Sequence, residues 1–252
     1  PRVIGISAAS FSDGGYQDGT FTLGGNHFGA STGSIAVNGA SQDGTPTWGA
    51  SSITGVGIPN GGTDSGSIVL THSDAKTSNS YSTFYIYPQI TGYTNTSDGT
   101  LTDGGRQTHL ITVSGNHFGA TTGTVSINAS VQDGTPTWAT SSITSVGIPD
   151  AGADSGVVVV TRSDSKPSNN SSAFYIYPTV TGIIDDFGGV NDTAREYAAG
   201  DNAANNTTAD LKDGEIQIDG NHFGASVAVT ILGQTATQAI VGTRCGSSAY
   251  SA

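Results

Sequence analysis

The sequence predicts an all-β fold in which small β-sandwiches follow one another along the chain. Glycine makes up 37 of the 252 residues, and Ser, Thr, Asn and Asp are abundant, so turn-forming residues are frequent. The apolar runs between the turns are short and rich in Val, Ile, Tyr and Phe, as β-strands are. Long motifs also recur at a fixed spacing, which indicates repeated structural units.

The repeat is visible in motifs that lie 90 positions apart. The matched pairs are GNHFGA at 25 and 115, QDGTPTW at 42 and 132, SSIT at 51 and 141, DSG at 64 and 154, and FYIYP at 84 and 174. A third GNHFGA begins at Gly220. Each unit opens with a proline and a short apolar run, which places the units at Pro1–Tyr87, Pro88–Tyr177 and Pro178–Ala252.

The junctions between units contain no flexible linker. The FYIY strand of one unit is followed directly by the proline that opens the next, and proline ends a β-ladder because it lacks an N–H group. We therefore expect stiff, closely abutting units in an extended, rod-like array. Alternating apolar residues indicate about seven strands in each complete unit, which is the strand number of an immunoglobulin-like sandwich. The aromatic residues expected in the cores are Phe28, Trp48, Phe84, Phe118, Trp138, Phe174 and Phe223.

The order of these motifs resembles the IPT/TIG family of immunoglobulin-like domains. The resemblance rests on a proline-led first strand, then GNHFG, a tryptophan, a strand ending in Ile-Pro, a DSG turn, a valine-rich strand and a closing FYIY. It covers both complete units and the third only through Ile231. Members of the family serve as adhesion modules, receptor stalks, inserts in surface enzymes and dimerisation domains, so the resemblance implies a spacer or recognition role and no chemistry of its own.

The third unit departs from the pattern in two places. Its GNHFGA comes 105 positions after the second one, and the additional residues form a long polar loop within 185–213, interpreted as a surface loop or a partner-binding loop. After Ile231 the Trp, Ile-Pro and FYIY strands are missing. The chain is thus a fragment of a longer protein, or the unit closes differently, or a strand of another copy completes it and generates a filament. Cys245, the single cysteine, is a free thiol or an inter-subunit link.

Candidate chemistry is sparse. The three GNHFGA histidines, His27, His117 and His222, fall in separate units, so they cannot share one metal ion and are interpreted as parts of a turn; His72 and His109 are expected to be solitary and exposed. No nucleophile elbow, phosphate loop or paired-carboxylate pattern occurs, and we expect no catalytic activity.

Calcium is the one metal considered, with Asp185, Asp186 and Asp192 as candidate ligands, although Asp-Gly turns explain such aspartates as well. The full set of loop aspartates near the unit junctions is Asp13, Asp18, Asp98, Asp103, Asp185, Asp186, Asp192, Asp210 and Asp213.

Composition narrows the partners. The formal net charge is −12, and only 11% of residues are charged, so the surface repels phosphate and nucleic acid is excluded as a partner. No run of 18 apolar residues occurs, so membrane insertion is not expected.

The sequence predicts a non-catalytic structural subunit or adhesive stalk of an extracellular filament or cell-surface assembly, forming a homo-oligomer or polymer. A virion structural protein and a carbohydrate-binding accessory module, with a carbohydrate or cell-surface ligand, are the alternatives.

Overall fold

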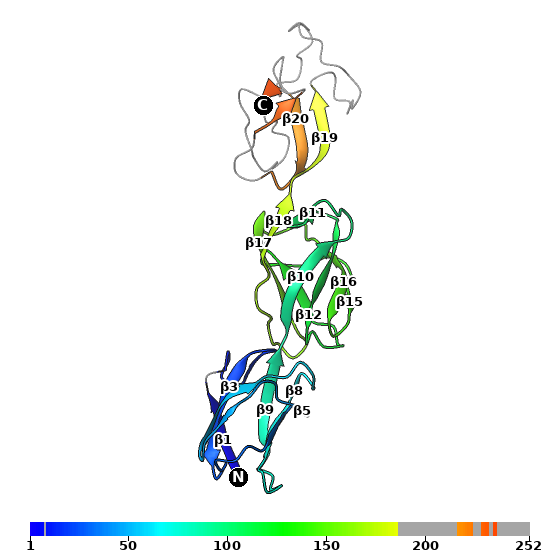
Figure 1. Ribbon diagram of the computed structural model, residues 1–252. Helices are drawn as coiled ribbons and strands as arrows, with labels where there is room; N and C mark the ends of the chain where they lie inside the picture. The colour runs from blue at the N-terminus through cyan, green and yellow to red at the C-terminus, as the bar shows by residue number, and fades with distance from the viewer. Residues whose placement is uncertain (8, 186–215, 224–227, 232–233, 236–252) are drawn as a thin grey trace, which may run out of the picture.

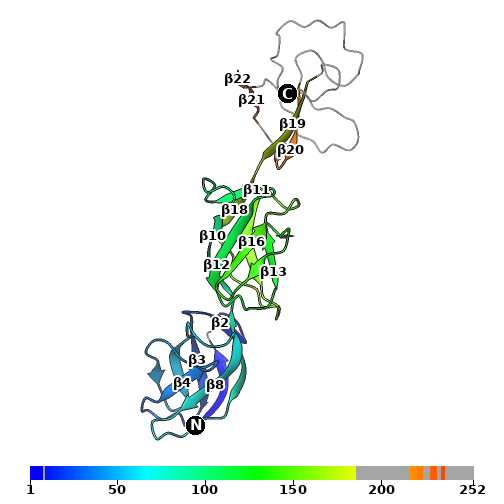
Figure 2. The same cartoon turned by 90° about the vertical axis from the view of Figure 1, so that its right-hand side faces the viewer.

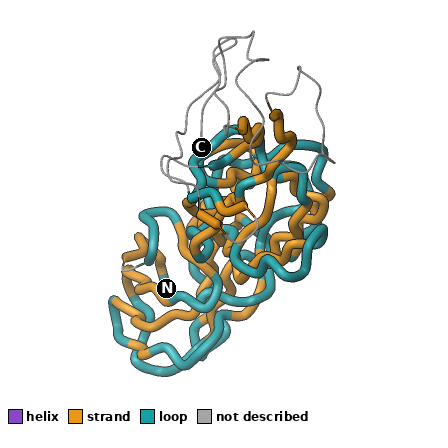
Figure 3. Tube along the Cα trace, turned by 90° about the horizontal axis from the view of Figure 1, so that it is seen from above, coloured by secondary structure: helices purple, strands orange, loops and turns teal. Residues whose placement is uncertain are grey.

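The computed structural model describes residues 1–7, 9–185, 216–223, 228–231 and 234–235. These residues form strands, turns and loops and contain no helix (Figure 3). Two β-sandwiches and the described part of a third unit follow one another end to end (Figure 1), and the turned view in Figure 2 shows the same extended arrangement. The predicted all-β fold of tandem β-sandwiches is therefore confirmed.

The first sandwich has two sheets. One sheet has the strand order β1-β3-β7-β6, and the other has the order β2-β9-β8-β4-β5. The strands are β1 (Arg2–Ser7), β2 (Gly14–Tyr16), β3 (Thr20–Asn26), β4 (Ser34–Val37), β5 (Ala40–Ser41), β6 (Thr47–Trp48), β7 (Ser52–Gly57), β8 (Ser65–Thr71) and β9 (Tyr81–Tyr87). The chain changes sheets between β1 and β2, and β2 pairs in parallel with the last strand, β9. A first segment divided between two packed sheets is compatible with an immunoglobulin-like sandwich.

The second sandwich repeats this topology strand for strand. Its sheets have the orders β10-β12-β16-β15 and β11-β18-β17-β13-β14, and β11 pairs in parallel with β18 as β2 pairs with β9. The strands are β10 (Gln89–Asn95), β11 (Gly104–Arg106), β12 (Leu110–Asn116), β13 (Thr124–Ile127), β14 (Ser130–Val131), β15 (Thr137–Trp138), β16 (Ser142–Gly147), β17 (Ser155–Thr161) and β18 (Ala173–Tyr177). The sequence repeat is thus a repeat of structure.

Each sandwich has a separate hydrophobic core between its two sheets. Alternate residues of the central strands point inward, so that Phe21 and Leu23 of β3 and Ile68 and Leu70 of β8 are fully buried. The second sandwich has its own cluster of buried residues, and this cluster shares no residue with the core of the first. Because neither core borrows residues from the other, each sandwich contains what a domain needs to fold alone.

The aromatic residues expected in the cores lie at different depths. Four of them have completely buried side chains: Phe28, Phe84, Phe118 and Phe174. The two tryptophans lie in two-residue edge strands, where they are partly buried and pack against the cores. Phe223 of the third unit is intermediate between buried and exposed. The phenylalanines therefore lie between the sheets, whereas the tryptophans lie at the edge.

The described part of the third unit opens with the same antiparallel strand pair as the two sandwiches. Strand β19 (Thr179–Asp185) pairs with β20 (Ile216–Asn221), and the register shifts between Val180 and Gly182. The same shift occurs between Val3 and Gly5 in the pair β1–β3 and recurs in β10–β12. Two further short strands, β21 (Thr230–Ile231) and β22 (Gln234–Thr235), pair with each other. The counterparts of β1 and β3 are therefore in place in the third unit.

Several predictions lie outside the described residues. They concern Asp186, Asp192, Cys245 and almost the whole 185–213 loop, of which Asp185 is the last residue of β19. The unit boundaries at Pro1–Tyr87, Pro88–Tyr177 and Pro178–Ala252, and the completion of the third unit by a neighbouring strand, stay predictions. Within the described ranges, no helix has the length and apolar character needed to cross a membrane.

Candidate functional site: the junction between the sandwiches

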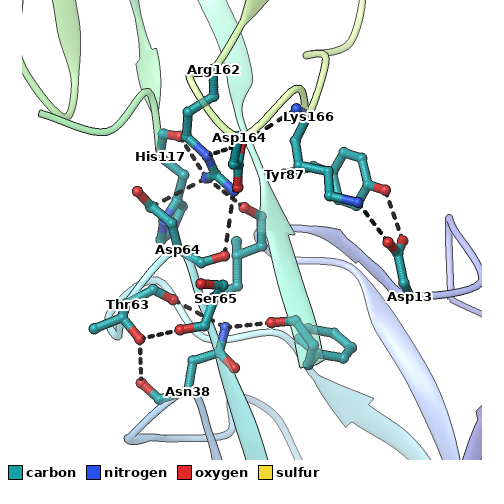
Figure 4. Close-up of polar contacts among 12 residues, drawn as sticks. Asp13, Asn38, Thr63, Asp64, Ser65, Tyr87, His117, Arg162, Asp164 and Lys166 are labelled. Carbon is teal, nitrogen blue, oxygen red and sulfur yellow. Dashed lines mark hydrogen bonds and ion pairs between the residues drawn. The ribbon is translucent and has the colours of Figure 1, made fainter. Parts of the chain in front are cut away.

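The first and second sandwiches meet where β9 passes into β10. Only Pro88 separates the end of β9 at Tyr87 from the start of β10 at Gln89. Figure 4 shows that loops of both sandwiches converge on this crossing strand. The first sandwich contributes Asp64, which precedes β8, and Asp13, which precedes β2. The second contributes His117 after β12, and the loop 162–166 between β17 and β18. We call this group of contacts the first junction.

The GNHFGA motif fixes the position of the junction histidine. A side chain at Gly115 would collide with the carbonyl oxygen of Gln89 and with the ring of Phe118, so only glycine fits there. Phe118 is buried in the core, and its N–H donates to the carbonyl oxygen of Thr140 at 3.0 Å. Between these two fixed residues His117 has a φ of 56°. This left-handed conformation, which histidine adopts more readily than most residues, sends the chain into the loop.

His117 forms the first contact between the sandwiches. Its Nδ1 lies 2.9 Å from Oδ1 of Asp64, and its side chain is only 8% exposed. Asp64 is held in place by its own sandwich, because its carbonyl oxygen accepts a hydrogen bond from the N–H of Ile86 in β9 at 2.9 Å. The carboxylate is therefore presented by a fixed loop to a fixed imidazole.

Arg162 is the most enclosed charged group of the junction, with a side chain 3% exposed. Its Nη1 donates to the carbonyl oxygen of Ile86 at 2.9 Å and to that of His117 at 3.1 Å. Nη1 also lies 3.4 Å from Oδ1 of Asp64, so the guanidinium bridges both sandwiches. A buried cation is tolerated only when its N–H groups have partners, and those of Arg162 find them on two domains.

Asp164 orients this arginine from within the second sandwich. Its carboxylate accepts from Nε of Arg162 at 2.9 Å and from Nη2 at 2.8 Å, which is the bidentate geometry that matches the planar guanidinium. Burial by itself would raise the pKa of Asp164, but the hydrogen bonds and charge of Arg162 outweigh it and hold this pKa below its ordinary value. Asp164 thus holds the guanidinium in the orientation in which it contacts the first sandwich.

Lys166 forms the second ion pair of the junction. Its Nζ lies 2.6 Å from Oδ2 of Asp13, whose Oδ1 accepts from the hydroxyl of Tyr87 at 2.7 Å. The ammonium also sits 3.9 Å from the centre of the Tyr85 ring, a cation–π distance. Burial alone would raise the pKa of Asp13, but the bonds from Lys166 and Tyr87 lower it overall. The bond to Asp13 in turn raises the pKa of Lys166.

The second junction, between the second sandwich and the third unit, repeats part of this arrangement. Nδ1 of His222 lies 2.9 Å from Oδ1 of Asp154, and the histidine side chain is 7% exposed. Arg106 donates through Nη1 to the carbonyl oxygen of Pro178 at 2.5 Å, and Asn221 bonds to the side chain of Gln107. The histidine–aspartate pair therefore recurs at both junctions.

The cations of the first junction have no counterpart in the described part of the third unit, which contains no Lys or Arg. Tyr177 still donates to Asp103 at 2.6 Å, as Tyr87 donates to Asp13, but no lysine of that part reaches the pair. The ring of Tyr175, which matches Tyr85, is correspondingly exposed. The second junction is thus the simpler of the two in the described residues.

The sequence interpretation of the histidines needs correction at four positions. His117 and His222 lie just after a strand with positive φ, and each also joins two units through an aspartate. His72, expected to be solitary and exposed, is partly buried and bonds through Nδ1 to Asp74 at 2.9 Å. His109, expected to be the same, lies 3.3 Å from the amide nitrogen of Asn95. Only His27 is an exposed histidine without a polar partner in the described residues.

Sequence reasoning missed the roles of Asp64, Arg162 and Lys166. A signal was present, because THSDAK at 71–76 and TRSDSK at 161–166 align in the repeat and keep a basic residue at the same two places. Asp13, one of the aspartates considered for calcium, bonds instead to Lys166 and Tyr87. Among the described residues no group of three or more His, Cys, Asp or Glu side chains is placed to hold a metal ion. The calcium prediction for Asp185, Asp186 and Asp192 stays a prediction.

At the first junction each carboxylate contacts a cationic side chain, and each cationic side chain bonds to a carboxylate. Arg162 also bonds to carbonyl oxygens. Such an arrangement fixes one domain on another. It presents neither a nucleophile with a neighbouring base nor a pair of free acids, which are the requirements of hydrolytic chemistry. The geometry therefore favours a mechanical role for this site.

Comparison with families and with curated proteins finds no match to this sequence. Solved structures give weak similarities. A surface glycan-binding protein of Prevotella bryantii is 16% identical with a TM-score of 0.37, over 74% of this chain and 44% of that one. A second, SGBP-B from a complex xyloglucan utilization locus in Bacteroides uniformis, is 14% identical with a TM-score of 0.30, over 70% and 49%. The gamma-CGTase of Bacillus clarkii is 15% identical with a TM-score of 0.29, over 70% and 26%.

The chain spans less than half the length of each of these three proteins. Likeness of this degree does not assign a ligand, an activity or a family to the chain. The structure itself establishes the tandem β-sandwiches and the contacts at their junctions.

Proposed function

We propose that the chain is a non-catalytic structural or adhesive stalk at a cell surface, in which β-sandwiches joined in series hold a stiff line. The observation that carries this proposal is the buried guanidinium of Arg162, which bonds to backbone and side-chain oxygens of both sandwiches. A flexible string of domains would have no reason to enclose a charge between neighbours, because the charge loses its hydration there.

The positions of the contacts explain why the junction resists bending. The covalent strand β9–β10 is one connection, and Figure 4 shows Asp64 and Asp13 on opposite sides of it. His117 and Arg162 hold the side of Asp64, and Lys166 holds the side of Asp13. Tilting toward one side stretches the contacts of the other, and twisting about the strand stretches both. The junction therefore opposes bending and torsion together.

Distance measurement between spin labels tests the stiffness. With Cys245→Ser removing the single native thiol, labels are placed at Thr45 and Thr135, exposed positions that match in the two sandwiches. We expect a narrow distance distribution that broadens when Arg162→Ala and Lys166→Gln are combined. Arg106→Ala at the second junction is the matched control and leaves the distribution narrow. A broad distribution in the unaltered junction would rule out a stiff stalk.

Assembly into a filament stays a prediction, and it depends on Pro178–Ala252. The alternative, a virion structural role, and the IPT/TIG resemblance also stay predictions. Light scattering and negative-stain electron microscopy over a concentration series distinguish the cases. Ordered polymers that disappear on deletion of Pro178–Ala252 support a subunit that completes its neighbour. A rod-shaped monomer at every concentration supports a stalk without self-assembly.

Carbohydrate binding is the second candidate function, and the exposed ring of Tyr175 is the observation that favours it. Sugars commonly stack on open aromatic faces, and among the described aromatic residues Tyr175 alone is exposed. A glycan array of the full chain tests this, with Tyr175→Ala as the loss-of-binding variant. Tyr85→Ala is the matched control, since the equivalent ring is covered by Lys166. Binding that survives Tyr175→Ala excludes this ring as the site, and no binding at all removes the candidate.

A further inference from the structure

The first sandwich carries, at its amino-terminal end, the same group of residues with which the second sandwich grips its neighbour. The residues 90 positions before His117, Arg162, Asp164 and Lys166 are His27, His72, Asp74 and Lys76. We call these four residues the open face. In the second sandwich the equivalent face is covered by the first sandwich, whereas in the first sandwich no described residue of another unit covers it.

The open face has the conformation that the occupied face has. His27 has a φ of 58° against 56° for His117. His72 packs across Gly29 as Arg162 packs across Gly119. These matches show that contact with a neighbouring unit is not what shapes the face.

The loop behind the face is also the same. The N–H of His72 donates to the carbonyl oxygen of Lys76 at 2.8 Å, and the matching bond from Arg162 to Lys166 is 3.0 Å. Nδ1 of His72 lies 2.9 Å from Asp74, where Nε of Arg162 lies 2.9 Å from Asp164. Ala75 has a φ of 65°, as does Ser165. The loop is therefore built to present a basic side chain whether or not a neighbour is there.

The two faces differ in what they contact. His117 is bonded to Asp64 of the preceding sandwich and Lys166 to Asp13, while His27 and Lys76 are exposed and have no such partner among the described residues. Two exposed basic side chains thus extend from a backbone of defined conformation, in a chain whose net charge is −12. They complement a surface that offers two carboxylates at the spacing of Asp64 and Asp13.

We propose that the open face docks the carboxyl-terminal end of another repeat of this class, joined in line to Pro1 through the Tyr–Pro connection seen at Tyr87 and Pro88. Such a repeat offers the aspartate of a DSG loop to His27 and the aspartate of a DGG turn to Lys76. The inference rests on the stiff junction of the proposed function and extends it to a third interface.

The in-line arrangement follows from the geometry of the occupied face. Pro1 stands before β1 as Pro88 stands before β10, so an incoming strand reaches the open face along the same path. A second copy of the chain is a poorer occupant, because in the described residues its two DSG aspartates are already bonded to His117 and His222.

The experiment adds one repeat to the full chain. A copy of residues 1–87 is placed directly before Pro1, in the Cys245→Ser background, with spin labels at Thr45 of the added repeat and Thr45 of the native one. The separate core of the first sandwich allows the added copy to fold. We expect a narrow distance distribution resembling that of Thr45 and Thr135 across the first junction.

Two variants separate docking from mere linkage. His27→Asn with Lys76→Gln in the native first sandwich keeps a residue suited to positive φ and removes both basic groups, and we expect the distribution to broaden. His72→Arg restores the arginine of the second sandwich, and we expect the distribution to narrow. A broad distribution that neither variant changes, while Thr45 and Thr135 stay narrow, overturns the docking proposal alone.

Two other outcomes also decide against it. A broad distribution between Thr45 and Thr135 overturns the stiff junction together with this inference. Dimerisation of the unextended chain in sedimentation, abolished by His27→Asn with Lys76→Gln, shows that the occupant is a second copy and not a repeat in line.

Discussion

The two junctions of the chain contain the same histidine–aspartate pair but differ in the charges around it. At the first junction Asp64 faces both His117 and Arg162 and is 33% exposed, whereas at the second Asp154 faces His222 and is 48% exposed. The histidine belongs to the repeat motif, so every unit brings it. The buried arginine is an addition of the second sandwich. The comparison separates a contact common to the repeat from one that strengthens a particular junction.

The largest effect is expected from removing the arginine. Arg162→Ala removes the guanidinium that contacts Asp64, Asp164 and the carbonyl oxygen of Ile86. Loss of one partner of a buried ion pair costs about 3 kcal/mol. The matched change in the first sandwich, His72→Ala, removes a partly exposed group and is expected to cost below about 1 kcal/mol. Urea unfolding gives both free energies.

Fluorescence assigns each loss to its sandwich, because each sandwich contains one of the two tryptophans. Trp48→Phe leaves Trp138 as the reporter of the second sandwich, and the reverse change leaves Trp48 as the reporter of the first. Equal losses for Arg162→Ala and His72→Ala would contradict the view that burial between two domains distinguishes the arginine.

Replacing the aspartate that pairs with each histidine should also cost more stability at the first junction than at the second. Asp64→Asn removes the charge facing His117 and Arg162, and we expect a cost of about 1.5 kcal/mol, at the lower end for hydrogen bonds to charged groups. Asp154→Asn affects a more exposed pair and is expected to cost about 0.5 kcal/mol. Thermal unfolding of both variants at low and high salt measures the difference. A larger loss for Asp154→Asn would reverse the comparison.

Replacing the histidines removes what the junctions share. Asn at position 117 or 222 keeps a residue that accepts positive φ, so the change reports on the contact with aspartate rather than on the turn. We expect similar costs of about 1 kcal/mol for His117→Asn and His222→Asn. Hydrogen exchange of the amides in β12 and β20 measures both. If only His117→Asn changes hydrogen exchange, the histidine–aspartate pair stabilises the first junction and not the second.

The sequence predicts the sandwiches well because their determinants are local and repeated. Alternation predicts the core strands, and in the two sandwiches the phenylalanines of GNHFGA and FYIY are fully buried. The tryptophans are less buried than expected because they lie in edge strands of two residues, and alternation cannot distinguish an edge strand from a central one.

The junction could not be predicted in the same way. Asp64 and Arg162 are 98 positions apart, and Asp13 and Lys166 are 153 apart, so no local pattern links them. Their partners become visible only when one unit is placed on the next. What the sequence does contain is the periodic return of a histidine and of two basic residues in THSDAK and TRSDSK. Periodicity marks a residue as part of the repeat, and the fold then shows whether it serves the core or the neighbour.

The smallest effect is expected from Lys166→Gln, whose loss concerns a partly exposed pair and a cation–π contact. We expect about 0.5 kcal/mol at neutral pH, measured by urea unfolding with Trp138 as reporter. Because the folded chain lowers the pKa of Asp13, the pair contributes above the ordinary carboxyl value of 3.8 and loses its contribution as pH falls through the lowered value. Because the pKa of Lys166 is raised, the contribution is complete below 10.5 and is lost as pH rises through the raised value.

The cost of Lys166→Gln should therefore form a plateau between these limits and vanish on both sides. Asp13→Asn is the matched control and should give the same plateau, since it removes the other half of the pair. The hydroxyl of Tyr87 still has an oxygen to donate to in that variant, so a difference between the two plateaus measures what the lysine gains from the Tyr85 ring. A cost that does not change with pH would mean that Lys166 acts through packing of its aliphatic stem and not through its charge.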